Sequence, residues 1–169
     1  MHAIFVDIEN EFSDIAEEVD HLSRFLDRLG DAELSATGQA SWEAARVCAS
    51  ATEKIYTGCE RIMAKVAREV DGAPVSHAEG WHAALLRRIA HPFPGIRHSI
   101  ISDACYRQLD RLRAFRHRER NTYGTNLDFD IVIERGREAV AIFGVFHEEV
   151  RSFFTAGQIR AEEHQDPPT

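Results

Sequence analysis

Residues 5–30 read "FVDIENEFSDIAEEVDHLSRFLDRLG", the most regular apolar pattern in the chain. Its apolar residues alternate three and four positions apart, which places them on one face of an α-helix while acidic residues fill the other faces. The stretch therefore predicts one long amphipathic helix whose apolar stripe other helices must cover. The stripe consists of Phe5, Ile8, Phe12, Ile15, Val19, Leu22, Leu26 and Leu29.

A second helix is predicted from near Gln39 to about Val70, with helical spacing of its apolar residues. Gly58 lies in its middle, where glycine costs about 1 kcal/mol relative to alanine, so a close approach of another helix is a plausible reason for it. The residues expected to face inward are Trp42, Ala45, Cys48, Thr52, Ile55, Cys59, Ile62, Val66 and Val70.

Capping and turn signals divide the rest of the chain into three further helices. "SHAE" at 76–79 has the spacing of a capping box and predicts the start of a short helix, and "HPFPG" at 91–95 predicts a sharp turn. Ser102 and Asp128 are good N-caps for a fourth and a fifth helix. The predicted fold class is all-α, an up-and-down bundle of four long helices plus one short helix. We expect a single helical-bundle domain over residues 1–160 and a disordered tail over 161–169.

The composition limits the classes of function. A formal net charge of −8 over 169 residues argues against non-specific binding of the whole surface to nucleic acid or anionic lipid, but not against a local anion site. The three cysteines form no CxxC pattern and read as free thiols of a cytoplasmic protein. No apolar run approaches the roughly 20 residues that cross a bilayer, and the N-terminus does not resemble a signal peptide, so no membrane association is expected.

Positive charge is concentrated in the fourth predicted helix, where residues 111–120 hold five arginines and a histidine against one glutamate. On a helical wheel Arg116 falls on the buried stripe that Cys105, Leu109 and Leu112 define. Arg120 and Tyr123 share this face. A guanidinium on this apolar stripe must either pair with an acid or bind a ligand. It is either a structural ion pair with an acid such as Glu60 or Asp71, or a phosphate site to which His117 adds proton transfer.

The stretch "FRHRERNTYGTNLD" at 115–128 resembles the signature of the HepT-like toxins, HEPN-type proteins that pair with MNT-type minimal nucleotidyltransferases. Four upstream stretches resemble the same family in the expected order, so that the resemblance covers most of residues 55–128. They are "IYTGCERIMAKVAREVDG" (55–72), "GWHAALLRRI" (80–89), "PGIRHSIIS" (94–102) and "LRAFRH" (112–117).

This resemblance implies a HEPN-like bundle that forms a homodimer and acts as a metal-independent endoribonuclease without a cofactor, with tRNA as one class of RNA substrate. It also implies a catalytic motif in which an Arg is followed by four residues, a His, one further residue and a Tyr. In such a pair the cognate nucleotidyltransferase is the antitoxin and neutralises the toxin by AMPylation of this Tyr. By position the arginine is Arg116 and the tyrosine is Tyr123, whereas Asn121 stands where the histidine is expected. The predicted catalytic residues are therefore Arg116, His117, Arg120 and Asn121.

Two other interpretations compete with this one. Asn121 cannot transfer protons, which favours a non-catalytic HepT-like module that binds a nucleotide or partner. Glu-x-x-His spacing at Glu18–His21 and Glu79–His82 is typical of di-iron bundles. Both pairs fall off their apolar stripes, so the sequence predicts no metal site, and the remaining loop and surface histidines are expected to be solvated, His82 among them.

Overall fold

The computed structural model describes residues 2–31, 38–76, 78–121 and 128–163, and it describes no side chain at 2, 30–31, 117–121 or 157–163. These residues form five helices and, apart from one isolated bridge between Phe93 and Arg97, no β-structure. The predicted all-α class is confirmed. The helices are α1 (His2–Asp31), α2 (Gln39–Glu69), α3 (Trp81–Ala90), α4 (Asp103–Asn121) and α5 (Phe129–Glu163).

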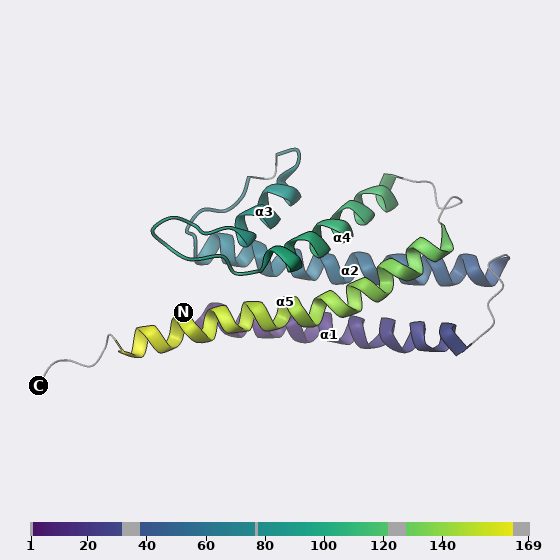
Figure 1. Cartoon of the computed structure of the whole chain (residues 1–169), viewed down its shortest axis with the longest axis horizontal. Coiled ribbons are helices and arrows are strands. Elements are labelled where there is room, and N and C mark those ends of the chain that lie inside the picture. The colour runs from purple at the N-terminus through teal and green to yellow at the C-terminus, as the bar shows by residue number, and fades with distance from the viewer. Residues whose placement is uncertain (1, 32–37, 77, 122–127, 164–169) are drawn as a thin grey trace, which may run out of the picture.

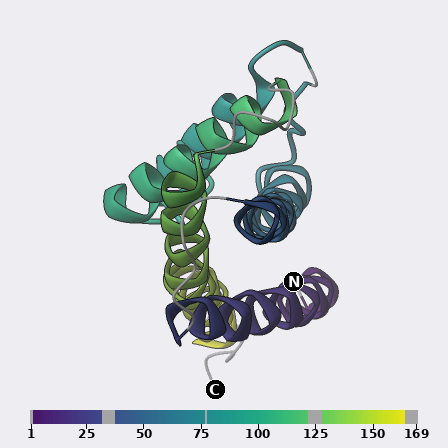
Figure 2. The ribbon, with the colours of Figure 1, turned by 90° about the vertical axis from the view of Figure 1, so that its right-hand side faces the viewer.

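The four longer helices alternate in direction along the bundle, as an up-and-down arrangement requires (Figure 1). Viewed from the end, α2 and α5 form a middle pair, with α1 on one side and α3 and α4 on the other (Figure 2). The short helix α3 packs against both α2 and α4. Because α2 contacts every other helix, its surface is buried on more than one face.

The stripe on α1 supplies one wall of the core, as its spacing predicts. Ile8, Phe12, Ile15, Leu22 and Leu26 are all buried, and they pack in one cluster with residues of α2 and α5. A methyl group at Gly58 of α2 would lie 2.4 Å from Ile15 Cγ1, closer than van der Waals contact allows. Close approach of α1 and α2 therefore requires glycine at this position.

The predicted caps at the starts of α4 and α5 are confirmed. The Ser102 hydroxyl accepts a hydrogen bond from the Cys105 backbone N–H at 3.2 Å. The Asp128 carboxylate accepts bonds from the N–H groups of Asp130 and Ile131, at 3.1 and 3.3 Å. At its other end, the backbone of α5 continues to Glu163, three residues into the stretch predicted as a tail, and 164–169 lie outside the described residues.

Two local predictions are wrong. The short helix begins at Trp81 rather than near Ser76, because Gly80 precedes it in the left-handed conformation, with φ 77°, and no side chain caps it. Trp42 was expected to face inward but is 47% exposed. It lies in the first turn of α2, at the end of the bundle, where its ring contacts the Arg46 guanidinium at 5.7 Å instead of the core.

The predicted turn at 91–95 folds back onto the bundle through a buried arginine. Arg97 binds Asp71 with both edges of its guanidinium, at 2.6 Å from Nε and 3.0 Å from Nη2. Its other N–H groups donate to the backbone carbonyls of Arg88, His91 and His98. This residue therefore holds the end of α2, the end of α3 and the following turn together.

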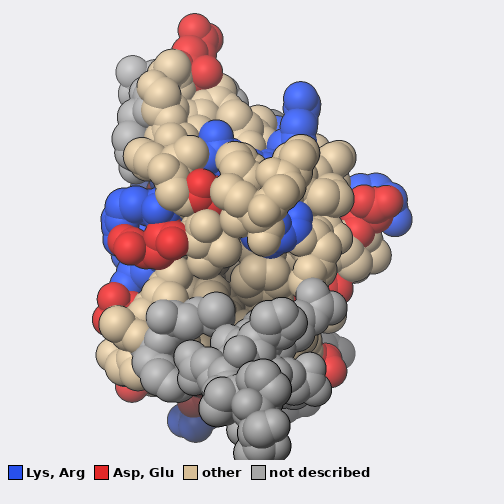
Figure 3. All heavy atoms as spheres, turned by 90° about the vertical axis from the view of Figure 1, so that its left-hand side faces the viewer, with Lys and Arg blue, Asp and Glu red and all other residues tan. Residues whose placement is uncertain are grey.

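The same end of the molecule carries an open pocket of about 700 Å³ between α1, α5 and the 96–98 segment. Where its residues are described, this end of the molecule has mostly uncharged surface, with Lys, Arg, Asp and Glu side chains both within it and at its edges (Figure 3). Its apolar lining includes Ile4, Val70, Ile96 and Phe154. None of the described helices combines the length and the apolar composition that crossing a bilayer requires.

Candidate functional site

Three polar residues line one face of α2 opposite α4. Glu53, Tyr56 and Glu60 are spaced three and four positions apart, so their side chains rise from successive turns of the same face. Glu60 and Tyr56 are almost completely buried, and Glu53 is partly exposed. Since buried carboxylates require a partner, this face of α2 needs a cation from a neighbouring helix.

Arg116 of α4 supplies that cation. Its Nη1 donates to Glu60 Oε2 at 3.0 Å, its Nε lies 3.6 Å from Glu53 Oε1, and its guanidinium lies 5.9 Å from the centre of the Tyr56 ring. The Arg116 side chain is 11% exposed, so the ion pair with Glu60 is largely shielded from water. The sequence proposed Glu60 or Asp71 as the partner of Arg116. The pairing with Glu60 is confirmed, and the pairing with Asp71 is wrong, because Asp71 forms its ion pair with Arg97.

His82 of α3 completes this cluster, contrary to the prediction that it is simply solvated. Its Nδ1 lies 2.5 Å from Glu60 Oε1 and 3.4 Å from Arg116 Nη1. The side chain is half-buried, and its ring packs on Trp81 with 3.9 Å between ring centres. Glu60 thus receives one partner on each carboxylate oxygen, from α4 and from α3. We call Glu53, Tyr56, Glu60, His82 and Arg116 the α2–α4 cluster.

Two polar atoms of the cluster have unused hydrogen-bonding capacity. Both the Tyr56 hydroxyl and the Arg116 Nε are buried and make no hydrogen bond within the described part of the chain. Burial, reinforced by the negative charge of Glu60, raises the pKa of Tyr56 well above its ordinary value, so the hydroxyl remains protonated. Unpaired buried polar groups are uncommon in folded proteins and are often found where a ligand or a reaction uses them.

Arg116 also borders a pocket of about 400 Å³ on the α1 side of the cluster. Its charged lining is evenly divided between acids and bases, and two of the bases are engaged, Lys54 with Glu18 and Arg61 with Glu11. The lining thus carries no net charge. The charged residues are Asp14, Glu18, Glu53, Lys54, Arg61 and Arg116.

The other predicted site residues follow Arg116 in the sequence. His117, Arg120 and Asn121 belong to the last turns of α4, of which only the backbone is described, and Tyr123 lies outside the described residues. The structure therefore places the helix that carries the first three, but it does not describe how their side chains meet.

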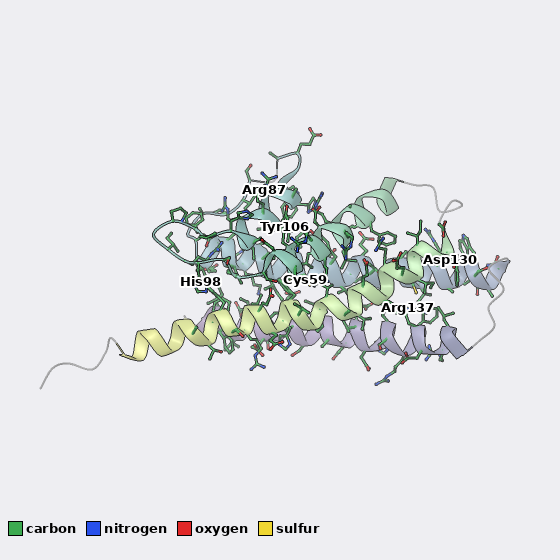
Figure 4. The ribbon with its side chains drawn as sticks, viewed as in Figure 1. Cys59, Arg87, His98, Tyr106, Asp130 and Arg137 are labelled. Atoms are coloured by element: carbon green, nitrogen blue, oxygen red, sulfur yellow. The ribbon has the colours of Figure 1, made fainter. Side chains whose placement is uncertain are left out.

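Charge is divided unevenly between the two sides of the bundle. Residues 81–121, which include α3 and α4, contain nine of the 20 basic residues but only three of the 28 acidic residues, a net charge of +6 that leaves −14 for the rest of the chain. Arg87, Arg107 and Arg111 on this side are exposed. Figure 4 places Arg87 and Tyr106 on the α3–α4 side, away from α1. The segment that includes α3 and α4 is thus the basic part of the sequence of an acidic protein.

Sequence reasoning missed Glu53, Tyr56 and His82. The spacing of Glu53, Tyr56 and Glu60 is visible in the sequence, but α2 is buried on several faces, so no single stripe distinguishes them. His82 was considered for a Glu-x-x-His metal pair with Glu79. Glu79 is exposed, and the described residues contain no group of three or more His, Cys, Asp or Glu side chains that could hold a metal ion.

Comparison with known proteins identifies a family. A family model described as "HepT-like protein" matches residues 47–156, about two thirds of the chain, including most of α2 and all of α3 and α4. No curated protein and no solved structure matches the chain. The matched region contains every member of the α2–α4 cluster.

Proposed function

The chain belongs to the HepT-like family, and we propose that it is the toxin of a toxin–antitoxin pair. In this proposal it is a metal-independent endoribonuclease of the cytoplasm that a cognate MNT-type nucleotidyltransferase neutralises by AMPylation of Tyr123. The observation that carries the proposal is Arg116 of the basic α3–α4 segment, which is buried, makes no hydrogen bond through Nε in the described part of the chain, and has a half-buried histidine beside it. The three cysteines are free, which suits a reducing compartment.

The chemistry of RNA cleavage fits residues of this kind. Attack of a ribose 2′-hydroxyl on the adjacent phosphate needs a base, an acid and positive charge on the phosphorane, but no metal. Arginine suits the charge role because its planar fork matches phosphate oxygens. Arg116 and Arg120 are proposed to hold the phosphate, and His117 and Asn121 to contact the reacting groups, with RNA, including tRNA, as substrate.

The proposed neutralisation rests on the family resemblance, and the spacing of the sequence is compatible with it. Tyr123 comes seven residues after Arg116 and three after Arg120 in the sequence, and we propose that an AMP group on Tyr123 would bring a phosphate to these arginines. The added negative charge would compete with RNA phosphate for the same arginines. The nucleotidyltransferase would thereby occupy the site that it inhibits.

Intact-mass spectrometry tests this modification directly. The full chain is incubated with ATP and the nucleotidyltransferase encoded beside it, and the expected result is a mass gain of one or more AMP units that Tyr123→Phe abolishes. Tyr123→Phe should still cleave RNA and arrest growth in the presence of the antitoxin. A mass gain that survives this substitution would remove Tyr123 from the proposal.

Ribonuclease activity has its own test. Purified chain is incubated with bulk tRNA and with a mixed-sequence single-stranded RNA, with and without EDTA. We expect cleavage that EDTA leaves unchanged and that Arg116→Ala lowers at least about 100-fold. Loss of activity in EDTA would contradict the metal-independent mechanism.

A second candidate function is a non-catalytic HepT-like module that binds a nucleotide or a partner protein. It is favoured by the environment of Arg116, whose charge is already offset by Glu60 and partly by Glu53. Asn121 favours it as well, since asparagine cannot transfer a proton. The two candidates differ in one result: the module would bind the nucleotidyltransferase but leave both RNAs intact.

We further propose a homodimer, on the family resemblance. The apolar stripe of α1, which first suggested one, is largely buried within the chain by α2 and α5, so it no longer supplies an argument. Exposed apolar residues remain on α1 and α5 as possible contacts, including Val6, Ile131 and Val145. Light scattering at micromolar concentration should give the mass of two chains, and the mass of one chain would contradict the proposal.

A further inference from the structure

The ring of His82 is held in one orientation by Glu60. Its Nδ1 lies 2.5 Å from Glu60 Oε1, and the other oxygen of this carboxylate receives Nη1 of Arg116 at 3.0 Å. A carboxylate only accepts hydrogen bonds, so Nδ1 carries the proton in this pair. In the neutral ring the second nitrogen, Nε2, then has a free lone pair, which is the arrangement that a histidine needs to act as a base.

The surroundings of His82 favour this role. Among the described side chains, three groups face the ring: Glu60 of α2, Arg116 of α4, and Trp81 of α3 itself. The His82 side chain is 31% exposed, whereas Glu60 is 5% exposed. The carboxylate that orients the ring is therefore shielded, while the ring itself remains accessible to a substrate.

We infer that His82 is the general base for RNA cleavage at the α2–α4 cluster, and that Glu60 is its positioning residue. This inference rests on the proposed ribonuclease function. Nε2 removes the proton of the ribose 2′-hydroxyl, and the 2′-oxygen forms a bond to phosphorus. The bond from phosphorus to the 5′-oxygen breaks, and this oxygen takes a proton from water. The products are a 2′,3′-cyclic phosphate and a 5′-hydroxyl, and His82 returns its proton to solvent.

The position of Arg116 makes this step geometrically reasonable. Its Nη1 lies 3.4 Å from His82 Nδ1, so a phosphate held by the guanidinium would lie next to the imidazole ring. Arg116 Nε makes no hydrogen bond in the described part of the chain and lies 3.6 Å from Glu53 Oε1. A phosphate that displaces the partly exposed Glu53 carboxylate could engage this donor without breaking the bond to Glu60. Binding and proton transfer would then come from neighbouring side chains on α4 and α3.

The inference also addresses the departure of this chain from its family pattern. Asn121 stands where the resemblance implies a histidine, and an amide cannot take up a proton at neutral pH. A histidine contributed by α3 would restore proton transfer beside the same arginine. His117 is the competing candidate on α4, and it provides the natural comparison in an experiment.

The test compares four variants of the full chain, His82→Gln, His82→Gly, His117→Gln and His98→Gln, on bulk tRNA and mixed-sequence RNA. General acid–base catalysis contributes roughly 10²–10⁴-fold, so His82→Gln should lower kcat at least about 100-fold. Added imidazole should restore part of the activity of His82→Gly, which a purely structural role would not allow. His98 contacts the Phe153 ring beside α5, and its variant should cleave as the unchanged chain does.

The tautomer of His82 in the unchanged chain provides a second test, which still applies if the His82 variants fold poorly. Long-range ¹H–¹⁵N spectra of the unchanged chain should show His82 with its proton on Nδ1, and a proton on Nε2 would overturn the inference. Cleavage that persists in both His82 variants but disappears in His117→Gln would overturn the role of His82 alone. An unchanged chain that cleaves neither RNA would overturn the proposed ribonuclease, and the role of His82 with it.

Discussion

Arg97 and Arg116 are both buried arginines that pair with a carboxylate, yet their surroundings differ. All five N–H groups of Arg97 are used, two on Asp71 and three on backbone carbonyls. Arg116 binds Glu60 through one nitrogen, leaves Nε without a hydrogen bond in the described structure, and lies beside the unbonded hydroxyl of Tyr56. Arg97 therefore has no N–H donor left for a ligand, whereas Arg116 has one. This difference distinguishes a structural arginine from an arginine of a candidate site.

The largest expected effect is on stability, from Arg97→Ala. The substitution leaves Asp71 buried without its partner, and loss of one member of a buried ion pair costs about 3–5 kcal/mol. Urea unfolding should show this loss in the free energy of unfolding, while the folded fraction keeps its cleavage rate. An unfolding free energy within about 1 kcal/mol of the unchanged chain would end the interpretation of Arg97 as a structural residue.

Arg116→Ala should show the opposite pattern. Glu60 keeps its bond to His82 in this variant, so we expect a smaller loss of about 1–3 kcal/mol in unfolding free energy. Cleavage should fall at least about 100-fold, because removal of one preorganised charge from a reacting phosphate costs roughly that much. The comparison fails if Arg116→Ala unfolds as readily as Arg97→Ala and cleaves normally per folded molecule.

Gly58→Ala tests whether activity merely follows stability. The added methyl group would lie 2.4 Å from Ile15 Cγ1, and such overpacking costs about 1–3 kcal/mol. Thermal unfolding should show this loss, and Ile15→Ala should cost less stability in the Gly58→Ala chain than in the unchanged chain, because it relieves the overlap. Cleavage per folded molecule should not change. A parallel fall in activity would mean that the effect of Arg116→Ala cannot be read as chemistry.

The same pair of arginines shows how far the sequence alone leads. Cys105, Leu109 and Leu112 repeat at helical spacing, and one more step of four residues reaches Arg116, so its burial was predictable from local periodicity. Its partner could be narrowed to Glu60 or Asp71. The choice depends on Arg97, which reaches Asp71 only through the turn at 91–97, and no periodic pattern specifies the path of a turn.

The contact between His82 and Glu60, by contrast, could not be predicted from the sequence. This contact depends on how a ten-residue helix docks on α2 and α4, and this docking follows from tertiary packing rather than from the sequence of α3. The start of this helix was also misplaced, because Gly80 adopts a left-handed conformation that the capping-box spacing at 76–79 does not reveal. The long helices, by contrast, follow from their apolar stripes.

The smallest expected effect comes from Tyr56→Phe. The hydroxyl that this substitution removes is buried without a partner in the described structure, and an unsatisfied buried polar group is costly, so the variant should be equally stable or more stable by about 1 kcal/mol at neutral pH. Burial raises the pKa of Tyr56, so its neutral form contributes stability that is complete below pH 10, the ordinary pKa of tyrosine, and is lost as the pH rises above it.

The advantage of Tyr56→Phe over the unchanged chain should therefore widen above pH 10, since phenylalanine does not titrate. The three buried cysteines are shared by both chains and cancel in the difference. Urea unfolding at neutral and alkaline pH measures both effects. A loss of stability at neutral pH would mean that the hydroxyl has a bonding partner after all. The α2–α4 cluster would then contain one fewer unpaired polar group, and the contrast between Arg116 and the fully hydrogen-bonded Arg97 would weaken.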